Sequence, residues 1–411
     1  MRIHFLLTQD LESPGGLGRY FPLALGLRRL GHHVDISALH ADFASVTNQH
    51  FQIDGVAVHY VGPMHVRKIG NMKHYYGPAQ LAWIAAKGTM ALTHSALTIP
   101  ADIVHVGKPH PMNSVAGMVT ATLDRAKLVV DCDDYEAESN HFAKGLSGGW
   151  QRLGVVAFEK WTPRRAALVT TNTQFTRQKL LASGVDSARI VYLPNGVDAQ
   201  RFAIDAQSET ALAALRQRWG TARRPVVVYV GSMSLANHPV DLLLQAFLQV
   251  LGELPNALLL MVGGGQDYDR LVALAEELGL GESVRFTGRV AAADIPNYYR
   301  LGHDTVDPVH DDDVARGRAP LKLVESWAAG VPFVTADVGD RRFLLGNPPA
   351  GVLVEPGNPA ALAQGLVQIL TDSILAQTLA QLGSERVQAY FWDHLAAELA
   401  QSYNQLTREK S

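Results

Sequence analysis

The sequence predicts an α/β fold made of two doubly wound, Rossmann-like domains that face each other across a cleft. The first observation is that short apolar runs alternate with amphipathic stretches along most of the chain. The second is the length, because 411 residues are too many for one hydrophobic core. The third is a restart of the pattern after a polar helix expected at 207–219. A linker is therefore expected near 196–222, and ligands should bind at the carboxyl ends of the strands.

Each expected strand is a short apolar run bounded by polar residues or glycine. The expected helices carry apolar residues at helical spacing between these runs. Because the two kinds of element alternate, the strands should be parallel, with helices on both faces. We expect strands at 2–7, 34–39, 56–61, 102–106, 127–131, 167–171, 189–193, 225–230, 257–262, 284–287, 303–307, 332–335 and 351–354. We expect amphipathic helices such as those at 18–30, 112–123, 240–252, 268–278, 321–329 and 359–371, besides the polar helix at 207–219.

Three segments follow from this pattern. Residues 1–198 form the expected N-terminal domain and residues 199–385 the C-terminal domain. The remaining 386–411 should form a helix that packs back on the N-terminal domain. No short-period repeat or low-complexity tract interrupts this organisation.

Composition excludes several classes of function. A formal charge of −3 leaves no electrostatic footprint for nucleic acid. Cys132 is the single cysteine, so no internal disulfide can form and a reducing, cytoplasmic location is expected. No apolar run approaches the roughly 18 residues of a spanning helix, and the first strand is too short for a signal sequence.

A basic and aromatic stretch at 64–83 is compatible with contact at the inner face of a membrane. It could form a lip that meets an anionic acceptor or lipid headgroups. A solvated loop is an equally good interpretation. The residues concerned are Arg67, Lys68, Lys73, Tyr75, Tyr76 and Trp83.

Three glycine turns connect an expected strand to an expected helix. Gly15 and Gly16 follow the first strand, Gly231-Ser232 follows the strand at 225–230, and Gly264 lies in a glycine triplet after the strand at 257–262. Glycine at such a turn lets backbone N–H groups approach a phosphate or a sugar. A single turn of this kind is weak evidence, whereas three together favour a phosphate-bearing ligand.

Lys322 and Glu325 lie three residues apart at the start of the helix expected at 321–329. The backbone N–H groups and the dipole at a helix N-terminus favour anions, so one interpretation places this pair at an anion-binding helix start. The alternative is a solvated surface pair that contributes a few tenths of a kcal/mol.

The sequence resembles the retaining glycosyltransferases of family 4, which have the glycosyltransferase-B fold. The resemblance rests on "PGGLGRYFPLALGLRRLGHHV", "DIVHVGKPH", "RIVYLPNGVDAQRF", "YVGSMS", "LLLMVGGGQDYDRL" and "LKLVESWAAGVPFVTADVGD", in the family's order. It implies that the N-terminal domain serves the acceptor and the C-terminal domain binds a nucleotide sugar. It also implies that Glu325 accepts hydrogen bonds from the ribose hydroxyls, while Lys322 points at the donor diphosphate. The donor-binding residues implied are Gly15, Gly16, Gly231, Ser232, His238, Gly264, Val290, Arg316, Arg318, Leu321, Lys322, Leu323 and Glu325.

The sequence departs from the family pattern at three places. Gly317 stands where a second glutamate usually contacts the donor sugar. The usual Gly-Arg after the strand is Gly231-Ser232, and a lysine farther on is replaced around Asn237-His238. We expect Arg316, Arg318 and Lys322 to supply the missing positive charge. The loop at 310–313 is expected to be solvated, or to contact the donor sugar in place of the missing glutamate.

In the N-terminal half, the histidine of the family near the reacting sugar maps to His105 or to the position of Gly107. His110 and Lys108 are close candidates, and a packed core histidine is an equally good interpretation of His105. Asp133 and Asp134 lie at another strand end and could bind acceptor hydroxyls or act as a base. The catalytic residues implied are His105, His110 and Lys322; no metal site is expected, because the spacing of His and Asp fits no closed ligand set.

The function implied is transfer of a sugar from a nucleoside-diphosphate sugar to an acceptor with retention of the anomeric configuration. No cofactor and no metal are expected beyond the donor substrate. The acceptor could be a small molecule, a lipid-linked sugar or a polysaccharide. The alternatives are a sugar-nucleotide-binding protein that has lost catalysis, or a nucleotide-sugar epimerase or phosphorylase on the same fold.

Overall fold

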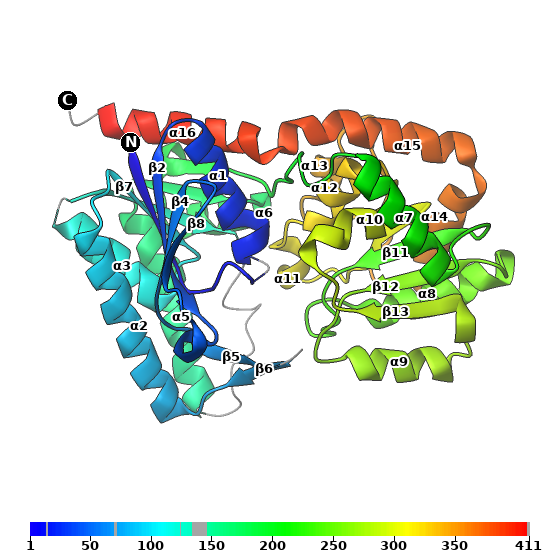
Figure 1. Cartoon of the computed structure of the whole chain (residues 1–411), viewed down its shortest axis with the longest axis horizontal. Helices are drawn as coiled ribbons and strands as arrows, with labels where there is room; N and C mark the ends of the chain where they lie inside the picture. The colour runs from blue at the N-terminus through cyan, green and yellow to red at the C-terminus, as the bar shows by residue number, and fades with distance from the viewer. Residues whose placement is uncertain (14, 70–71, 124, 134–145, 409–411) are drawn as a thin grey trace. The chain divides into compact units, whose positions relative to one another are not determined.

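The computed structural model describes all residues except 14, 70–71, 124, 134–145 and 409–411. The chain forms two compact units (Figure 1). Unit 1 comprises Met1–Gly196, Gly317–Ala319 and Trp392–Ser411, and unit 2 comprises Val197–Arg316 and Pro320–Phe391. Each unit is built on its own sheet, and both sheets are described below by themselves.

The main sheet of unit 1 has the strand order β10-β9-β8-β7-β1-β2-β4-β3 among the described residues. All neighbours are parallel except β3 and β4, where β3 is an antiparallel edge strand. A separate antiparallel hairpin consists of β5 (Val66–Ile69) and β6 (Met72–Tyr75). The strands are β1 (Arg2–Leu7), β2 (His33–His40), β3 (His50–Ile53), β4 (Val56–Pro63), β7 (Ile103–Gly107), β8 (Lys127–Cys132), β9 (Leu168–Thr171) and β10 (Ile190–Tyr192).

Helices cover both faces of this sheet. On one face Leu23 and Leu27 of α1 pack with Leu395 and Leu399 of α16 in a single buried cluster. On the other face the helices α2, α3 and α6 pack on the same strands. The helices of unit 1 are the π-helical turn η1 (Gly16–Tyr20), α1 (Phe21–Arg29), α2 (Pro78–Thr98), α3 (Pro111–Thr122), α5 (Leu146–Arg165), α6 (Gln174–Ala182) and α16 (Trp392–Arg408).

The sheet of unit 2 is parallel throughout and has the described order β13-β12-β11-β14-β15-β16. Its central strands are fully buried, as their β-branched and leucine-rich sequences predict for a sheet covered on both faces. The strands are β11 (Val226–Val230), β12 (Leu258–Val262), β13 (Val284–Gly288), β14 (Asp304–Asp307), β15 (Phe333–Ala336) and β16 (Val352–Val354).

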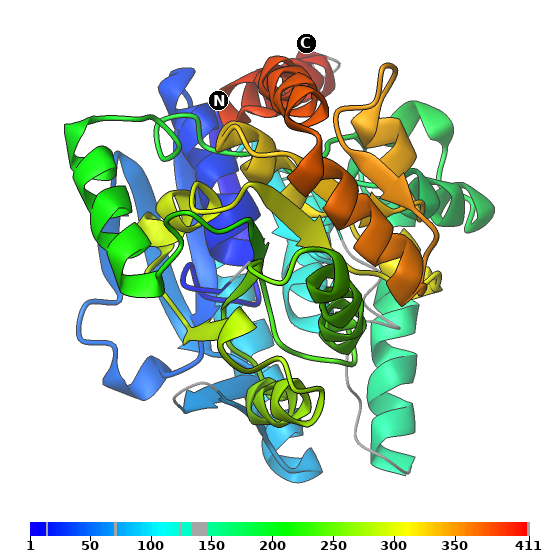
Figure 2. The same cartoon turned by 90° about the vertical axis from the view of Figure 1, so that its right-hand side faces the viewer.

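Two helical layers enclose the sheet of unit 2 (Figure 2). Leu243 and Phe247 of α8 pack with Leu366 of α14 on one face. Tyr299 of α10 and Trp327 of α12 belong to the cluster on the other. The helices are α7 (Ala206–Trp219), α8 (Val240–Glu253), α9 (Tyr268–Glu277), α10 (Ile295–Tyr299), α11 (Asp313–Arg316), α12 (Leu321–Ala328), α13 (Arg341–Leu345), α14 (Pro359–Thr371) and α15 (Ser373–Arg386).

Each sheet has a point at which the strand order reverses. In unit 1 the chain winds from β1 towards β2 on one side and from β7 towards β8 on the other. In unit 2 the corresponding point lies between β11 and β14. Ligands of doubly wound sheets bind beyond the carboxyl ends of the strands at this point. The two parallel sheets confirm the predicted α/β class, and they direct attention to the loops after β1, β7, β11 and β14.

The segmentation differs in detail from the one expected. The units change at Gly196/Val197, residues 317–319 belong to unit 1, and the last helix begins at Trp392. Among the described residues no single helix is long and apolar enough to cross a membrane; α14 and the helical stretch Ser373–Tyr390 meet the requirement only as a pair bent by 97°.

Candidate functional site

Glu325 lies on α12, which starts directly beyond the switch point of unit 2. The helix places Lys322 and Glu325 nearly one turn apart, and Val324 and Trp327 fix its inner face in the core. Pro320 occupies the N-cap and offers no side-chain cap. Glu325 is buried, although it is a charged residue. A buried carboxylate requires partners, and the structure supplies them.

Each carboxylate oxygen of Glu325 accepts a hydrogen bond. Arg201 Nη1 donates to Oε1 at 3.3 Å, and the Tyr299 hydroxyl donates to Oε2 at 3.0 Å. Burial raises the pKa of Glu325, and the charge of Arg201 is the strongest effect that opposes the rise. Burial also raises the pKa of Tyr299 well above its usual value, so the phenol remains a donor. Glu325 is thus held as an oriented acceptor, and each oxygen has capacity for a further hydrogen bond.

Lys322 belongs to a three-membered ion cluster. Its Nζ donates to Asp307 Oδ1 at 2.7 Å, and Arg341 Nη2 donates to Asp307 Oδ2 at 2.8 Å. The ammonium also lies 5.3 Å from the centre of the Tyr229 ring. Burial would raise the pKa of Asp307, but Lys322 and then Arg341 lower it well below the usual range. Two cations on one carboxylate leave one positive charge in excess at the end of β14.

The glycines of unit 2 are required by packing between two turns. A Cβ on Gly263 would lie 2.0 Å from the carbonyl oxygen of Gly231, and one on Gly265 would lie 2.3 Å from that of Met233. Gly231 itself faces Lys322, because its Cβ would lie 2.8 Å from Lys322 Cε. The turns after β11 and β12 therefore lie directly against each other. Side chains on Gly263 and Gly265 would separate them.

The other expected donor-binding residues of unit 2 lie in different environments. Ser232 is exposed, and its backbone oxygen accepts from the Tyr229 hydroxyl at 2.8 Å. Arg316 is exposed and makes two hydrogen bonds to Asp311, at 2.8 and 3.0 Å. The expected solvated loop at 310–313 therefore already pairs with this arginine. Leu323 and Gly264 are buried, while His238, Val290 and Leu321 are half-buried.

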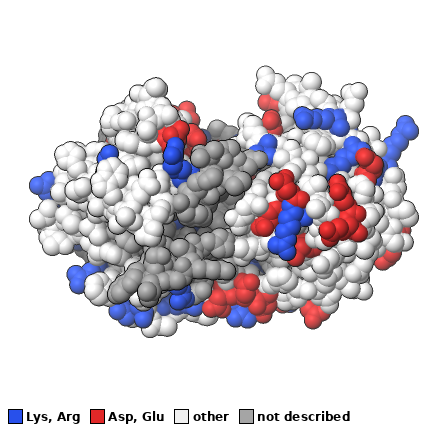
Figure 3. All heavy atoms as spheres, turned by 90° about the horizontal axis from the view of Figure 1, so that it is seen from below, with Lys and Arg blue, Asp and Glu red and all other residues white. Residues whose placement is uncertain are grey.

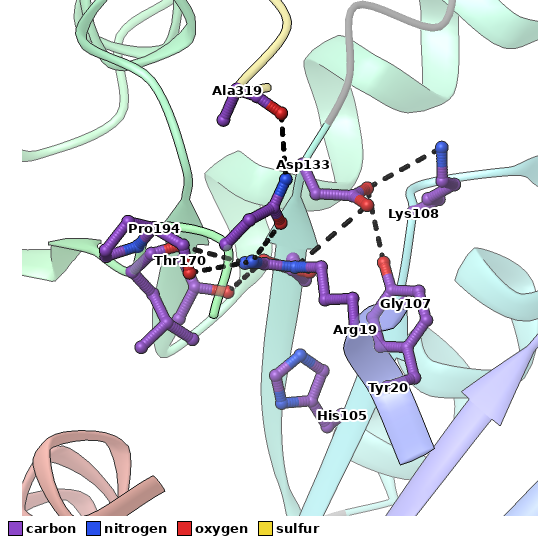
Figure 4. Close-up of polar contacts among 12 residues, drawn as sticks. Arg19, Tyr20, His105, Gly107, Lys108, Asp133, Thr170, Pro194 and Ala319 are labelled. Carbon is purple, nitrogen blue, oxygen red and sulfur yellow. Dashed lines mark hydrogen bonds and ion pairs between the residues drawn. The ribbon is translucent and has the colours of Figure 1, made fainter. Parts of the chain in front are cut away.

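A second charged cluster lies at the switch point of unit 1. Arg19, from η1, is buried and binds Asp131 of β8 through two hydrogen bonds, 2.7 and 2.8 Å long. Figure 4 shows its remaining N–H groups directed at the turn after β10: the oxygens of Leu193, Pro194 and Asn195 accept them at 3.0–3.2 Å. All five N–H groups of Arg19 are thus satisfied. Burial would raise the pKa of Asp131, but Arg19 outweighs it and lowers the pKa.

Lys108 and Asp133 lie beside this cluster. The Tyr20 hydroxyl donates to Asp133 Oδ1 at 3.2 Å, and Lys108 Nζ lies 3.8 Å from the same oxygen. Lys108 has a φ of +60°, a conformation that costs free energy in a non-glycine residue and is frequent at functional sites. The Asn113 side chain holds this turn by donating to the carbonyl oxygens of Gly107 and Lys108. Asp134 lies outside the described residues.

The two candidate histidines occupy different positions. His110 is half-buried at the N-cap of α3, directly beyond the turn after β7, and its ring centre lies 5.8 Å from that of His65. His105 lies inside β7, is fully buried, stacks on Phe5 at 4.7 Å and is hydrogen-bonded to the Tyr403 hydroxyl. Burial lowers the pKa of His105 to about 4. The environment of His105 is that of a core residue; its catalytic role stays a prediction.

The remaining expected donor residues belong to unit 1. A Cβ on Gly16 would lie 2.2 Å from the carbonyl oxygen of Asp10, and one on Gly15 would lie 2.4 Å from Gln9 Nε2. Both glycines therefore allow the turn after β1 to fold closely on itself. Arg318 is half-buried in the 317–319 stretch of unit 1.

Over the described surface seen in Figure 3, basic and acidic side chains are interspersed. Within the described residues no group of three or more His, Cys, Asp or Glu side chains could hold a metal ion. Cys132 is buried at the end of β8.

Sequence reasoning missed the partners of the predicted site residues. Arg201, Tyr299, Asp307 and Arg341 hold Glu325 and Lys322, yet none was singled out. Arg201 carried a usable signal, because it comes three residues after Asp198 of the Pro-Asn-Gly-Val-Asp motif. The sequence signal for Asp307 was weak, because it consisted only of an aspartate at the end of the strand expected at 303–307.

Comparisons with known proteins identify two matching domain families. Residues 15–196 match the family model described as "Glycosyl transferase 4-like domain", and residues 224–372 match "Glycosyl transferases group 1". The chain is 30% identical over 236 residues to a GDP-mannose-dependent alpha-(1-6)-phosphatidylinositol monomannoside mannosyltransferase of Mycobacterium tuberculosis, which covers 57% of this chain and 60% of that protein. It is 29% identical over 263 residues to a D-inositol 3-phosphate glycosyltransferase of Xylanimonas cellulosilytica, covering 62% and 61%. The matched part thus spans about 60% of the length of these relatives.

Solved structures resemble the whole chain in fold. Sucrose-phosphate synthase from Thermosynechococcus elongatus superposes with a TM-score of 0.77 at 20% identity and 99% coverage of both chains. Anabaena HepE in complex with UDP-glucose gives 0.72 at 20% identity, with 98% of this chain and 100% of that chain covered. At this identity the likeness concerns the fold alone.

Proposed function

Because the chain belongs to the group 1 glycosyltransferases with a 4-like N-terminal domain, we propose that it transfers a sugar from a nucleoside-diphosphate sugar to an acceptor with retention of the anomeric configuration. The observation that carries this proposal is the pair of functional groups on α12. Glu325 is an oriented hydrogen-bond acceptor, and Lys322 brings positive charge to the same helix start.

In this proposal Glu325 accepts hydrogen bonds from the ribose hydroxyls of the donor. A carboxylate has two oxygens with several lone pairs, so it can hold the donor and keep Arg201 and Tyr299 as partners. Lys322 stabilises the negative charge that grows on the diphosphate as the glycosidic bond breaks. The net positive charge of the cluster of Lys322, Asp307 and Arg341 supports this role.

Arg316 and Arg318 are proposed as secondary contacts of the diphosphate. Arg316 would have to exchange its hydrogen bonds with Asp311 for bonds to phosphate oxygens. Gly231 lets the turn after β11 approach the donor closely. Lys108, His110 and Asp133 of unit 1 are proposed to contact the acceptor and the reacting sugar, since they lie together beyond the carboxyl ends of β7 and β8.

The names of the relatives suggest which substrates to test first. One relative is GDP-mannose-dependent and acts on a phosphatidylinositol monomannoside, and another is a D-inositol 3-phosphate glycosyltransferase. We propose a hexosyl donor and an inositol-containing or lipid-linked acceptor. Product release measured with GDP-mannose and UDP-glucose, with each acceptor and without it, tests this choice. NMR of the product's anomeric centre tests retention.

The decisive experiment concerns Glu325. Glu325→Ala should weaken nucleoside-diphosphate binding by about 1.5–3 kcal/mol, the range for hydrogen bonds to a charged group. Glu282→Ala is the matched control, because the Glu282 side chain is 92% exposed and lies in the same unit. Isothermal titration across guanosine, uridine and adenosine diphosphates provides the measurement. Unchanged affinity in Glu325→Ala would remove the donor site from α12. If the parent protein binds a nucleoside diphosphate tightly but transfers no sugar, the alternative of a sugar-nucleotide-binding protein that has lost catalysis is favoured instead.

A further inference from the structure

Arg201 is the charged partner of Glu325, and it is itself fixed. Its Nε and Nη2 both donate to the Ala292 carbonyl oxygen, at 3.2 and 2.8 Å, which leaves Nη1 directed at Glu325. The Asp198 side chain accepts from the backbone N–H groups of Gln200 and Arg201 at 2.8 and 3.4 Å, so the backbone is also held. Because the other edge of the Arg201 guanidinium is hydrogen-bonded to the Ala292 carbonyl oxygen, the guanidinium cannot move with Glu325 if the carboxylate rotates. The hydrogen bond from Nη1 can therefore form in only one orientation of the carboxylate.

We propose that Arg201 is a positioning residue, which keeps Glu325 ionised and oriented for the ribose hydroxyls of the donor. This inference rests on the proposed function, because it assigns Arg201 a task only if Glu325 binds the donor. Burial favours the neutral form of Glu325, and a neutral carboxyl group would lose one acceptor site and present an O–H instead.

The groups that face Glu325 define the pH dependence. Arg201 is the strongest of those that lower its pKa, followed by the hydrogen bond from Tyr299 and by the charge of Lys322. Lys322 is itself paired with Asp307. Donor binding should therefore fall as pH drops through the pKa of Glu325. Removing Arg201 raises that pKa further, so the acid limb of binding should move to higher pH.

The test is the pH profile of nucleoside-diphosphate affinity by titration calorimetry between pH 5 and 9. Arg201→Gln should move the acid limb up by about one pH unit, and its affinity should approach that of the parent at the alkaline end. Arg201→Lys keeps the charge and should recover part of the shift. Arg342→Gln is the control, since Arg342 is exposed and pairs with Asp337 elsewhere in unit 2.

A double mutant separates this inference from the proposed function. In Glu325→Gln, position 325 no longer carries a carboxyl group that can titrate. Adding Arg201→Gln should therefore not shift the pH profile of nucleoside-diphosphate affinity. If Glu325→Gln binds as tightly as the parent at every pH, the donor site itself is wrong. If Glu325→Gln weakens binding but Arg201→Gln lowers affinity equally at all pH values, the donor site stands and the positioning role of Arg201 is overturned.

A second, independent observation concerns α2 and α5 in unit 1. A surface helix normally turns polar residues to solvent, but the outer face of α2 carries Trp83 and Met90, which are 61% and 66% exposed. Lys87, whose Nζ lies 5.2 Å from the Trp83 ring, is the one charged residue in the 21 residues of α2. On α5, Leu153 and Trp161 are each 60% exposed. Both helices pack on α3, which has no charged residue.

The charges on these helices are nearly all positive. Helix α5 contains one acidic residue, Glu159, and four basic ones. Exposed tryptophan and basic side chains together match the boundary of an anionic bilayer, where the indole lies among headgroups and the cations meet phosphate. We infer that Trp83, Lys87 and Met90 of α2, together with Leu153 and Trp161 of α5, form a docking surface for anionic lipid. The basic residues of α5 are Arg152, Lys160, Arg164 and Arg165.

Sedimentation with vesicles tests the docking surface. The protein should sediment with phosphatidylglycerol-containing vesicles, bind phosphatidylcholine vesicles more weakly, and be released by salt. The double variant Trp83→Ser/Met90→Ser should reduce the bound fraction at least about fivefold. Ile374→Ser is the control, because Ile374 is 77% exposed on α15 of unit 2. Equal binding by the double variant and the parent, or no preference for anionic vesicles, would overturn this assignment.

Discussion

The charged clusters of the two units occupy equivalent places, yet they differ in what remains available to a ligand. In unit 1 every N–H group of Arg19 is taken by Asp131 and by the turn at 193–195. In unit 2 the Lys322 ammonium has one hydrogen-bond acceptor within the described part of the chain, Asp307, although it can donate three bonds. A cluster that uses all its donors stabilises a turn, whereas one with capacity left over can bind an anion.

The two clusters also differ in how far their charged side chains are buried. The Arg19 and Asp131 side chains are 3% and 0% exposed, while the Lys322 side chain is 13% exposed. Both pairs lie beyond parallel strands at a switch point, where ligands are expected. Position alone therefore does not identify a binding cation; the number of unused donors and their access to solvent does.

The largest expected effect is on stability. Arg19→Met leaves Asp131 buried without its counter-ion and should cost about 3–5 kcal/mol of unfolding free energy. Arg2→Met, which breaks an exposed pair with Asp102, should cost at most about 1 kcal/mol. Urea unfolding of unit 1, followed by its own tryptophans, checks both values. A stable Arg19→Met protein that has lost turnover would make Arg19 part of the functional site and end the contrast between the clusters.

Lys322→Ala should show the opposite pattern, with a large effect on turnover. Its loss removes charge stabilisation that grows in the transition state, so kcat should fall by about a hundredfold or more. Lys322→Arg should recover only part, because a planar guanidinium fits differently between Asp307 and Tyr229. Turnover and melting temperature should be measured on the same preparations. Normal kcat in Lys322→Ala would reduce Lys322 to a structural partner of Asp307.

Acid should destabilise unit 1 through two buried histidines. His4 and His105 each have a pKa lowered to about 4 by burial, against 6.5 when exposed. The unfolded chain therefore binds more protons between these values, and stability falls as pH drops below 6.5. At pH 5 each histidine should cost about 2 kcal/mol.

A substitution assigns this slope to one residue. His105→Gln should flatten the dependence of unfolding free energy on pH, while His94→Gln, at an exposed position of α2, should leave it unchanged. The same variant decides the predicted catalytic role of His105. A loss of turnover with an unaltered stability slope would favour catalysis over packing.

The smallest expected effect is that of a chelator. Because Lys322 and Arg341 bring net positive charge to the end of β14, we expect turnover to change less than about twofold in excess chelator. A loss of activity that magnesium restores would contradict this prediction. It would direct attention to the acidic loops around 131–134 and 311–313.

The regular elements of both sheets could be predicted because their signal is local. The strand expected at 2–7 is β1, and the helix expected at 359–371 is α14, with the same bounds. Strand β3 was missed because it is a short edge strand whose residues are mostly exposed. Helix α2 was missed because apolar residues surround it on all sides and leave no amphipathic period.

The site was predictable only where one helix carries it. Lys322 and Glu325 share α12, so their proximity follows from helical spacing. Arg201 lies 124 residues from Glu325, and Asp307 lies 15 residues before Lys322 on another element. Contacts of this kind depend on how strands are ordered in the sheet, which local patterns do not specify. The glycine turns were predicted to let backbone N–H groups approach a ligand. The structure adds a second reason for glycine at each turn, because a Cβ there would clash with neighbouring atoms.

The last helix has a consequence for how this protein is made on a ribosome. Unit 1 needs α16, since Gly26 of α1 packs on Ala396 and Tyr403 is buried against His105. These residues are synthesised after all of Val197–Phe391, so unit 2 can finish folding while unit 1, although begun first, still lacks part of its core. The usual N-terminal-first order of domain completion is thereby reversed. Until Trp392–Arg408 emerges, the nascent chain exposes the apolar face around Leu23 and Leu27, a natural target for chaperones.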